Sequence, residues 1–363
     1  MKMANREWLT REECTVMKGI AILGIMLHNY CHWLKDIVRE NEYTWQQWKC
    51  DRLWAVIQQP DEFLPMHLLS FFGHYGVPVF LFLSGFGLVM KYERGTLPEV
   101  GVWRFCRYNY LKLFRIFIVG FVLFVMLDAF TPGMHRYEAS EVVAMLGMYA
   151  NFFPHPSQVI WPGPYWYFSV TLQLYILYRL VFYHWRHWGV VAALVAVCWL
   201  WQLYCSDDME MLERLRYNLV GGLLPFGMGV LVARFEPSFM KHVKVTSSLP
   251  LMLSYLLVLV VMIGGIFMFS VLSFDKWLWV PALIVVGTIA LVKLIPKAIM
   301  PYILWLGSIS AAIFVMHPLV RKIFVRPYLY DDMYAGLLLY IVATLVVSWL
   351  AKKIIDQIPS PKL

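Results

Sequence analysis

Long apolar windows recur along this chain and constrain its fold more than any other feature. Ten of them, at about 20 residues each, are long enough to cross the ~30 Å hydrocarbon core of a bilayer as helices. Only 15% of the 363 residues are charged, against roughly 25% in soluble domains, which excludes an ordinary globular protein. The sequence predicts one all-α membrane domain over residues 1–363, a polytopic bundle of about ten transmembrane helices. The windows are Thr15–Leu34, Leu64–Met90, Tyr108–Phe130, Tyr165–Phe182, Gly189–Cys205, Leu219–Ala233, Leu249–Phe269, Trp277–Val292, Tyr302–Val325 and Tyr334–Ile354.

The distribution of Lys and Arg between the connections sets the expected orientation, because these residues are retained preferentially on the cytoplasmic side. With the N-terminus inside, the inner segments hold 20 Lys and Arg residues and the outer segments hold 11. Both termini are therefore predicted to be cytoplasmic, and we assign the net charge of +8 to topology rather than to binding of nucleic acid. Of the long outer segments, Lys35–Glu62 is expected to rest on the membrane surface as a helix, and Thr131–Pro164 to roof a cavity.

His28 is the most informative polar residue, because it lies inside the first apolar window. An ionisable side chain in hydrocarbon is costly and marks a functional site, so His28 is the candidate catalytic base. The alternative is a histidine that only hydrogen-bonds between packed helices. If the windows are straight helices, His28 and His317 lie about 20 and 22 Å from the cytoplasmic surface, with Gln173 near the same level. Four residues are candidates for binding the acceptor or orienting the base: Tyr167, Gln173, His317 and His74.

A second group of candidates lies at the cytoplasmic ends of the windows. Ser84 and Gly85 stand near the end of the second window, where small residues let a ligand approach the backbone. Lys18, Lys112 and Arg115 could hold phosphate groups there, although positive charge on this side is also the ordinary topological signal. The six cysteines form no CxxC pair or Cys/His cluster, so no metal site is expected.

Five sequence fragments, in order along most of the chain, resemble the acyltransferase 3 family of bacterial membrane proteins. KGIAILGIMLH resembles its first-helix signature of a basic residue, an apolar run and a histidine, and GVPVFLFLSGF resembles its second-helix motif. KLFR is similar to the paired basic residues that open the third helix of the family. WYFSVTLQLY and SISAAIFVMHP resemble the fourth-helix motif and the late Ser and His segment.

The resemblance implies transfer of an acyl group, usually acetyl, from cytoplasmic acyl-CoA to a hydroxyl of an extracytoplasmic glycan or glycolipid. The expected location is the bacterial cytoplasmic membrane, among its lipids. His28 would act as base or carry the acyl group covalently, with the CoA nucleotide held by the cytoplasmic basic residues and its arm passing Ser84. The acids common in the second and fourth motifs are replaced by Pro78 and Thr171, which leaves the partner of His28 open. Asp128 is one candidate.

Two rival functions remain open at this stage. A transporter or flippase for a lipid-linked sugar would use the polar, aromatic outer half, but the sequence has no inverted repeat with matching broken helices. A non-catalytic membrane sensor on the same core would explain the missing acids. The sequence predicts neither the identity of the acceptor nor the oligomeric state.

Overall fold

The computed structural model describes residues 8–242, 249–324 and 332–363, and all regular structure in these ranges is helical. Val325, the last residue of the ninth window, lies outside the described residues, as do residues 1–7. The helices are α1 Arg11–Cys31, α2 Gln47–Gln58, α3 Leu64–Phe72, η1 Gly73–Tyr75, α4 Gly76–Tyr92, α5 Val102–Ala129, α6 Ala139–Leu146, η2 Ala150–Phe152, α7 Pro156–Val159, η3 Gly163–Tyr165, α8 Trp166–Leu177, η4 Tyr178–Phe182, α9 Trp188–Tyr204, α10 Met209–Arg216, α11 Leu219–His242, α12 Leu249–Leu272, α13 Phe274–Trp277, α14 Val280–Leu294, α15 Met300–Ser308, α16 Ser310–Phe324 and α17 Met333–Gln357.

Each apolar window coincides with helical structure, which confirms an all-helical membrane protein. Six helical spans in the described ranges are long and apolar enough to cross a bilayer, and a broken pair, α15 with α16, would make a seventh. Helices α9 and α14 are apolar but shorter. Ten spans and cytoplasmic termini therefore stay predictions. The six spans are Arg11–Cys31, Leu64–Tyr92, Val102–Ala129, Leu219–Glu236, Leu249–Leu272 and Met333–Gln357.

The ninth window does not form the straight helix that the sequence predicted. It divides into α15 and α16, whose axes differ in direction by 72°. The break follows Gly307 and Ser308, a pair of the kind that commonly bends helices. Gly307 also lies so close to the start of α1 that a Cβ atom there would be 1.9 Å from the Thr15 carbonyl oxygen. The depth of about 22 Å predicted for His317 assumed a straight helix. The bend shows that this assumption was wrong.

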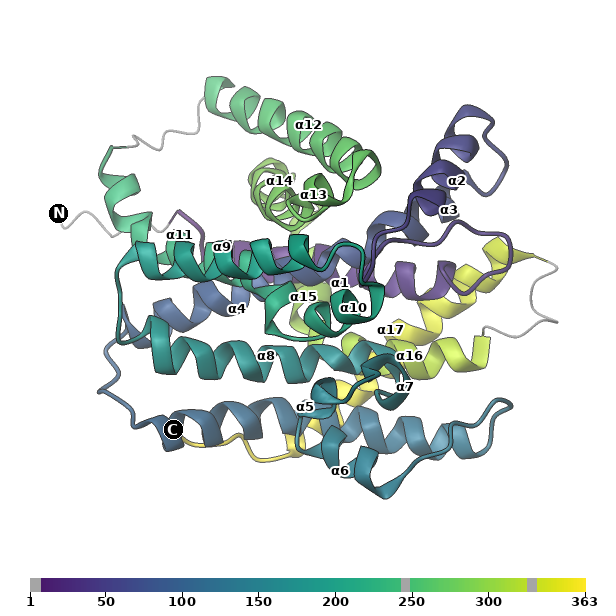
Figure 1. The fold of residues 1–363 in the computed structure, drawn as a ribbon, viewed down its shortest axis with the longest axis horizontal. Coiled ribbons are helices and arrows are strands. Elements are labelled where there is room, and N and C mark those ends of the chain that lie inside the picture. Colours follow the sequence, from purple (N-terminus) through teal and green to yellow (C-terminus); the bar gives the residue numbers. More distant parts are fainter. Residues whose placement is uncertain (1–7, 243–248, 325–331) are drawn as a thin grey trace.

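Helix α1 lies in the middle of the bundle, in contact with α3, η1, α4, α15 and α16 (Figure 1). A capping box between Thr10 and Glu13 begins it, and its buried face is apolar until it reaches His28 and Asn29. Gly24 lies against Gly73 at the junction of α3 and η1, where a Cβ on Gly73 would be 2.6 Å from the Gly24 carbonyl oxygen. The backbones of α1 and α3 can therefore approach closely beside His28.

Helix α12 shows which surface the bundle presents to lipid. It packs along α14 at the edge of the bundle, and few of its side chains are buried (Figure 1). Many of its large apolar residues are exposed, including Leu253, Leu257 and Val260. In water such a surface would favour aggregation, whereas in a bilayer the surrounding lipid chains cover it.

Candidate functional site

His28 is held in one tautomer by a backbone carbonyl. Its Nδ1 atom lies 2.7 Å from the carbonyl oxygen of Ser70, and only 2% of the residue is exposed. A carbonyl oxygen can only accept, so Nδ1 carries the proton and the Nε2 lone pair is free. Ser70 is in the last turn of α3, directly before the η1 turn that joins α3 to α4. Gly73 permits the approach, because a Cβ there would lie 2.6 Å from Cβ of His28.

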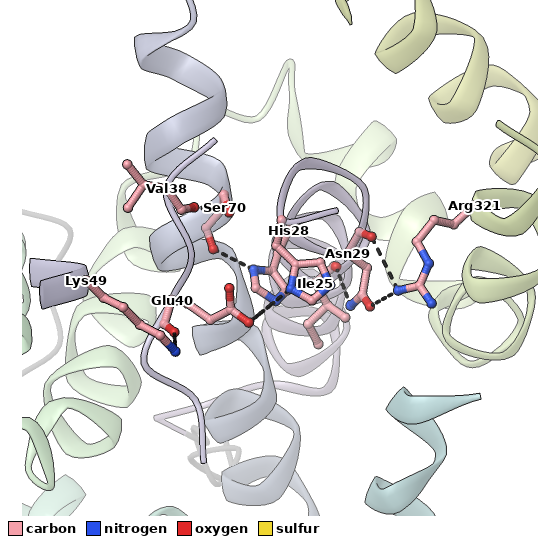
Figure 2. Close-up of polar contacts among 9 residues, drawn as sticks. Ile25, His28, Asn29, Val38, Glu40, Lys49, Ser70 and Arg321 are labelled. Carbon is pink, nitrogen blue, oxygen red and sulfur yellow. Dashed lines mark hydrogen bonds and ion pairs between the residues drawn. The ribbon is translucent and has the colours of Figure 1, made fainter. Parts of the chain in front are cut away.

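Glu40 reaches the other edge of the same ring. It follows α1 in the chain, is 8% exposed, and places Oε1 3.6 Å from Nε2 of His28 and 3.0 Å from Nδ1 of His32. Lys49 donates to the Glu40 backbone carbonyl at 2.7 Å, which fixes this segment (Figure 2). Burial opposes ionisation of Glu40, but the neighbouring histidines, His28 foremost, lower the pKa of the carboxyl group below its ordinary value. The missing partner of His28 is thus a residue in a connection, which the sequence motifs did not indicate.

A cavity of about 150 Å³ opens beside this pair. Trp161, Gly163 and Pro164, at the end of the segment Thr131–Pro164, line it. That the segment as a whole roofs the cavity stays a prediction. A smaller cavity of about 50 Å³ shares five of its lining residues and extends towards α10 and α11. The shared residues are Glu42, Tyr43, His74, Val77 and Trp166. The pair therefore faces a space that combines polar groups with flat aromatic rings.

Of the four residues predicted to bind the acceptor or orient the base, two line this cavity. They are His74, whose ring centroid lies 5.4 Å from that of His28, and Tyr167. His317 is fully buried, and its Nδ1 atom lies 3.1 Å from the Ile313 carbonyl oxygen of its own helix. Gln173 donates to Asn218 and accepts from the Leu219 backbone N–H, each at 2.9 Å, so it secures the start of α11.

Asp128, considered above as a partner for a histidine ring, lies elsewhere. It is fully buried and pairs with Lys322. Its carboxylate also accepts from the His135 backbone N–H at 2.8 Å and from the Tyr137 hydroxyl at 3.0 Å. Asp128 therefore ties the segment that covers the cavity to α16, and Glu40 is the acid beside His28.

The three basic residues predicted to bind acyl-CoA are Lys18, Lys112 and Arg115. Lys112 interacts with both of the others, but Arg115 also binds the C-terminal segment. Lys112 is exposed and interacts electrostatically with Lys18, Lys91 and Arg115. Arg115 is already engaged with the C-terminal segment, donating to the Ile358 carbonyl at 3.3 Å and lying 3.9 Å from Asp356. The positive charge at the end of the bundle where α1 begins is thus shared among residues of α1, α4 and α5.

The two small residues of α4 differ in their surroundings. Ser84 accepts a long hydrogen bond of 3.5 Å from the Tyr175 hydroxyl, in the interior between α4 and α8. Gly85 packs against α11, where an added Cβ would lie 2.2 Å from the Phe226 carbonyl oxygen. Gly85 therefore serves close helix packing, while Ser84 adds a polar group to the interior.

One group of side chains in the described ranges has the composition of a metal site. His28, His32 and Glu40 each offer one ligand atom, and these atoms all lie within 4.8 Å of one another. Two imidazoles and a carboxylate are a common zinc ligand set. A metal ion bound here would occupy the Nε2 lone pair that a base requires, so the two uses of His28 exclude each other.

Arg321 is the second residue that the sequence interpretation missed. It lies in the last turn of α16, is 8% exposed, and lines the cavity beside His28. Its Nη1 donates to Oδ1 of Asn29 at 3.0 Å, and Asn29 is the next residue after His28 (Figure 2). In the sequence, Arg321 is one arginine near the end of an apolar window. It was counted among the Lys and Arg residues that set the membrane orientation.

Fold and site together define a class, a helical membrane protein with a buried histidine–carboxylate pair beside a cavity. A family model described as an acyltransferase domain, that of the acyltransferase 3 family, matches residues 12–353, nearly the whole chain. The chain therefore belongs to this family, as the five motifs suggested, and this is consistent with a membrane acyltransferase. A search of the curated proteins and a search of the solved structures each found no match.

Proposed function

We propose that this protein transfers an acyl group, acetyl foremost, from cytoplasmic acyl-CoA to a hydroxyl of an extracytoplasmic glycan or glycolipid. The observation that carries the proposal is the free Nε2 lone pair of His28, fixed by the Ser70 carbonyl and turned towards the cavity and Glu40. In a family of acyltransferases, a base in the correct tautomer is what activation of a hydroxyl requires. The protein would act in the bacterial cytoplasmic membrane, among its lipids.

The reaction needs one proton carrier and one nucleophile. Nε2 of His28 takes the proton of the acceptor hydroxyl as its oxygen attacks the thioester carbonyl carbon. The tetrahedral intermediate collapses, the carbon–sulfur bond breaks, and the departing thiolate recovers the proton as CoA–SH. The Glu40 carboxylate, 3.6 Å from Nε2, stabilises the imidazolium that exists between the two proton transfers.

The donor would enter from the end of the bundle where α1 begins. Its phosphates would bind Lys18, Lys91 and Lys112. The positive charges of these lysines repel one another, and an anionic ligand would relieve this repulsion. The uncharged pantetheine arm would then pass the interior polar groups of Ser84 and Tyr175 towards His28. Arg115 would hold the C-terminal segment beside this entrance rather than contact phosphate directly.

The acceptor would occupy the cavity itself. Tyr43, Trp161 and Trp166 offer flat faces on which a sugar ring can pack, and His74 and Tyr167 offer polar atoms for its hydroxyls. This arrangement supports a glycan or a glycolipid headgroup as the acceptor class.

The test is release of thiol from acetyl-CoA by purified protein in liposomes, with an envelope glycan preparation as acceptor. We expect glycan-dependent release by the wild type and loss of at least about 10²-fold in His28→Ala, with unchanged membrane insertion. Equal turnover in both proteins would refute the mechanism. Movement of a lipid-linked sugar without CoA would indicate a transporter instead, and acyl-CoA binding without turnover would indicate a sensor.

A further inference from the structure

Arg321 is a buried cation without a counter-ion in the described part of the chain. Its exposed fraction is 8%, and its polar contacts are hydrogen bonds from Nη1 to Asn29, at 3.0 Å to Oδ1 and 3.4 Å to the backbone oxygen. The guanidinium carbon lies 4.8 Å from the centroid of the Trp33 ring. Among the residues described in 8–236, 249–324 and 332–363, no Asp or Glu forms an ion pair with it.

The nearby carboxylates have other partners. Glu40 lies between His28 and His32, and Figure 2 shows it reaching His28 from the side opposite to Arg321. Asp128 pairs with Lys322, one residue further along α16. Glu42, the acid that lines the same cavity, forms no ion pair with Arg321. Within the described residues, Arg321 therefore brings a positive charge to the cavity without an ion-pair partner.

A guanidinium has five N–H donors, and among the described residues only Asn29 accepts from it, through the single nitrogen Nη1. Burying such a group without a partner is costly, so an uncompensated arginine in a cavity indicates that a ligand provides the missing charge. The planar fork of donors matches two oxygens of one carboxylate or phosphate group. The Trp33 ring restricts the guanidinium plane on one side, which favours one orientation of that fork.

We propose that Arg321 binds an anionic group, a carboxylate or a phosphate, on the acceptor, and so makes this cavity specific for acidic glycans or phosphate-linked glycolipids. The inference rests on the proposed acyl transfer, since it assigns the acceptor class of the same site. Asn29 links the two functions, because it holds Arg321 and directly follows His28 in α1. An anion on Arg321 would thereby fix a neighbouring hydroxyl relative to the base.

The kinetic test compares three acceptors of similar size, a neutral glucan oligosaccharide, a uronic acid oligosaccharide and a sugar phosphate on a short lipid. Wild type, Arg321→Lys and Arg321→Gln are assayed with acetyl-CoA. The control is Arg52→Gln, which changes an exposed arginine of α2. We expect Arg321→Gln to raise KM for one of the charged acceptors by about 10- to 150-fold. Its kcat should change little, Arg321→Lys should retain part of the preference, and the control should behave as wild type.

Three outcomes would overturn the proposal. The first is equal use of neutral and charged acceptors by the wild type. The second is an equal fall of kcat with every acceptor in Arg321→Gln, which would make Arg321 a group that acts on the reacting carbonyl or on folding. The third is an effect of Arg321→Gln on KM that appears only when succinyl-CoA is the donor. It would show that Arg321 binds the carboxylate of the acyl donor.

A binding measurement keeps the inference testable if no acyl transfer is detected at all. The same uronic acid and phosphate ligands are titrated against His28→Ala and against the double variant His28→Ala/Arg321→Gln, with thermal stability as readout. Stabilisation that requires Arg321 supports the anion site even where the proposed activity fails. Stabilisation of both proteins to the same extent, or of neither, would refute it.

Discussion

The Glu40 carboxylate lies 3.6 Å from Nε2 of His28, while the Ser70 carbonyl holds Nδ1 on the other edge of the ring. The two contacts have different consequences. The carbonyl decides which nitrogen is free to accept a proton, and the carboxylate stabilises the charge that results. At an effective dielectric constant of about 20, two unit charges at this separation attract by on the order of 4 kcal/mol.

We therefore expect Glu40→Gln to lower kcat by about 10²- to 10³-fold, because the imidazolium loses its negative neighbour. KM for acyl-CoA should stay within about twofold of wild type, since the site proposed for the donor phosphates is at Lys18, Lys91 and Lys112. Glu62→Gln removes an exposed acid between α2 and α3 and serves as the control. Wild-type kcat in Glu40→Gln would show that the carboxylate takes no part in the reaction.

The close approach at Gly73 gives a prediction about folding and activity together. In Gly73→Ala the new Cβ would lie 2.6 Å from both the Gly24 carbonyl oxygen and Cβ of His28, so α1 and α3 must separate. We expect a loss of about 1–3 kcal/mol of stability and a lower kcat. In Gly87→Ala, the control on α4, the added Cβ has no atom within 4 Å. Thermal unfolding in detergent and the thiol-release assay measure the two effects, and equal behaviour of both variants would contradict the packing argument.

The ligand atoms of His28, His32 and Glu40 predict inhibition by zinc. A Zn²⁺ ion bound by two imidazoles and a carboxylate would occupy the Nε2 lone pair, so micromolar ZnCl₂ should stop transfer and EDTA should restore it. Each variant is compared with its own rate without metal. His32→Ala should raise the inhibition constant at least about tenfold, whereas His135→Ala, beside Glu141, should not. Identical inhibition of all proteins would place the effect at another site.

Glu42, between the two cavities, gives a pH dependence. Burial and the neighbouring Glu40 raise the pKa of Glu42 from 4.5 to about 8. Between these values the folded state binds more protons than the unfolded state, so the stability contribution is full below pH 4.5 and is lost as the pH rises to about 8. We expect Tm of the wild type to fall between pH 5.5 and 8.5 by about 2–4 °C more than Tm of Glu42→Gln. A parallel decline in the two proteins would contradict this origin.

The sequence predicted the membrane helices because a helix surrounded by lipid requires a long run of apolar residues. It also singled out His28, because an ionisable side chain inside an apolar window is a local pattern. The 72° break between α15 and α16 escaped the prediction, because the whole window is apolar whether straight or bent.

Glu40 and Arg321 were missed for a different reason. Glu40 lies in a connection rich in acids, where no periodicity distinguishes the one that turns inward from those that face solvent. Arg321 stands at the end of an apolar window, where a positive charge is ordinary. Their roles depend on contacts between segments far apart in the chain, and only the packing of α1 against α3 and α16 reveals them.

The use of a main-chain oxygen to hold His28 has an evolutionary consequence. A side-chain acid that orients a catalytic histidine is lost by a single substitution, but the Ser70 carbonyl is present whatever amino acid stands at that position. The tautomer is thus inherited through the course of the backbone rather than through the identity of one residue. Relatives that differ at this position would keep the same tautomer of the proposed base, provided that a glycine still allows the two helices to touch.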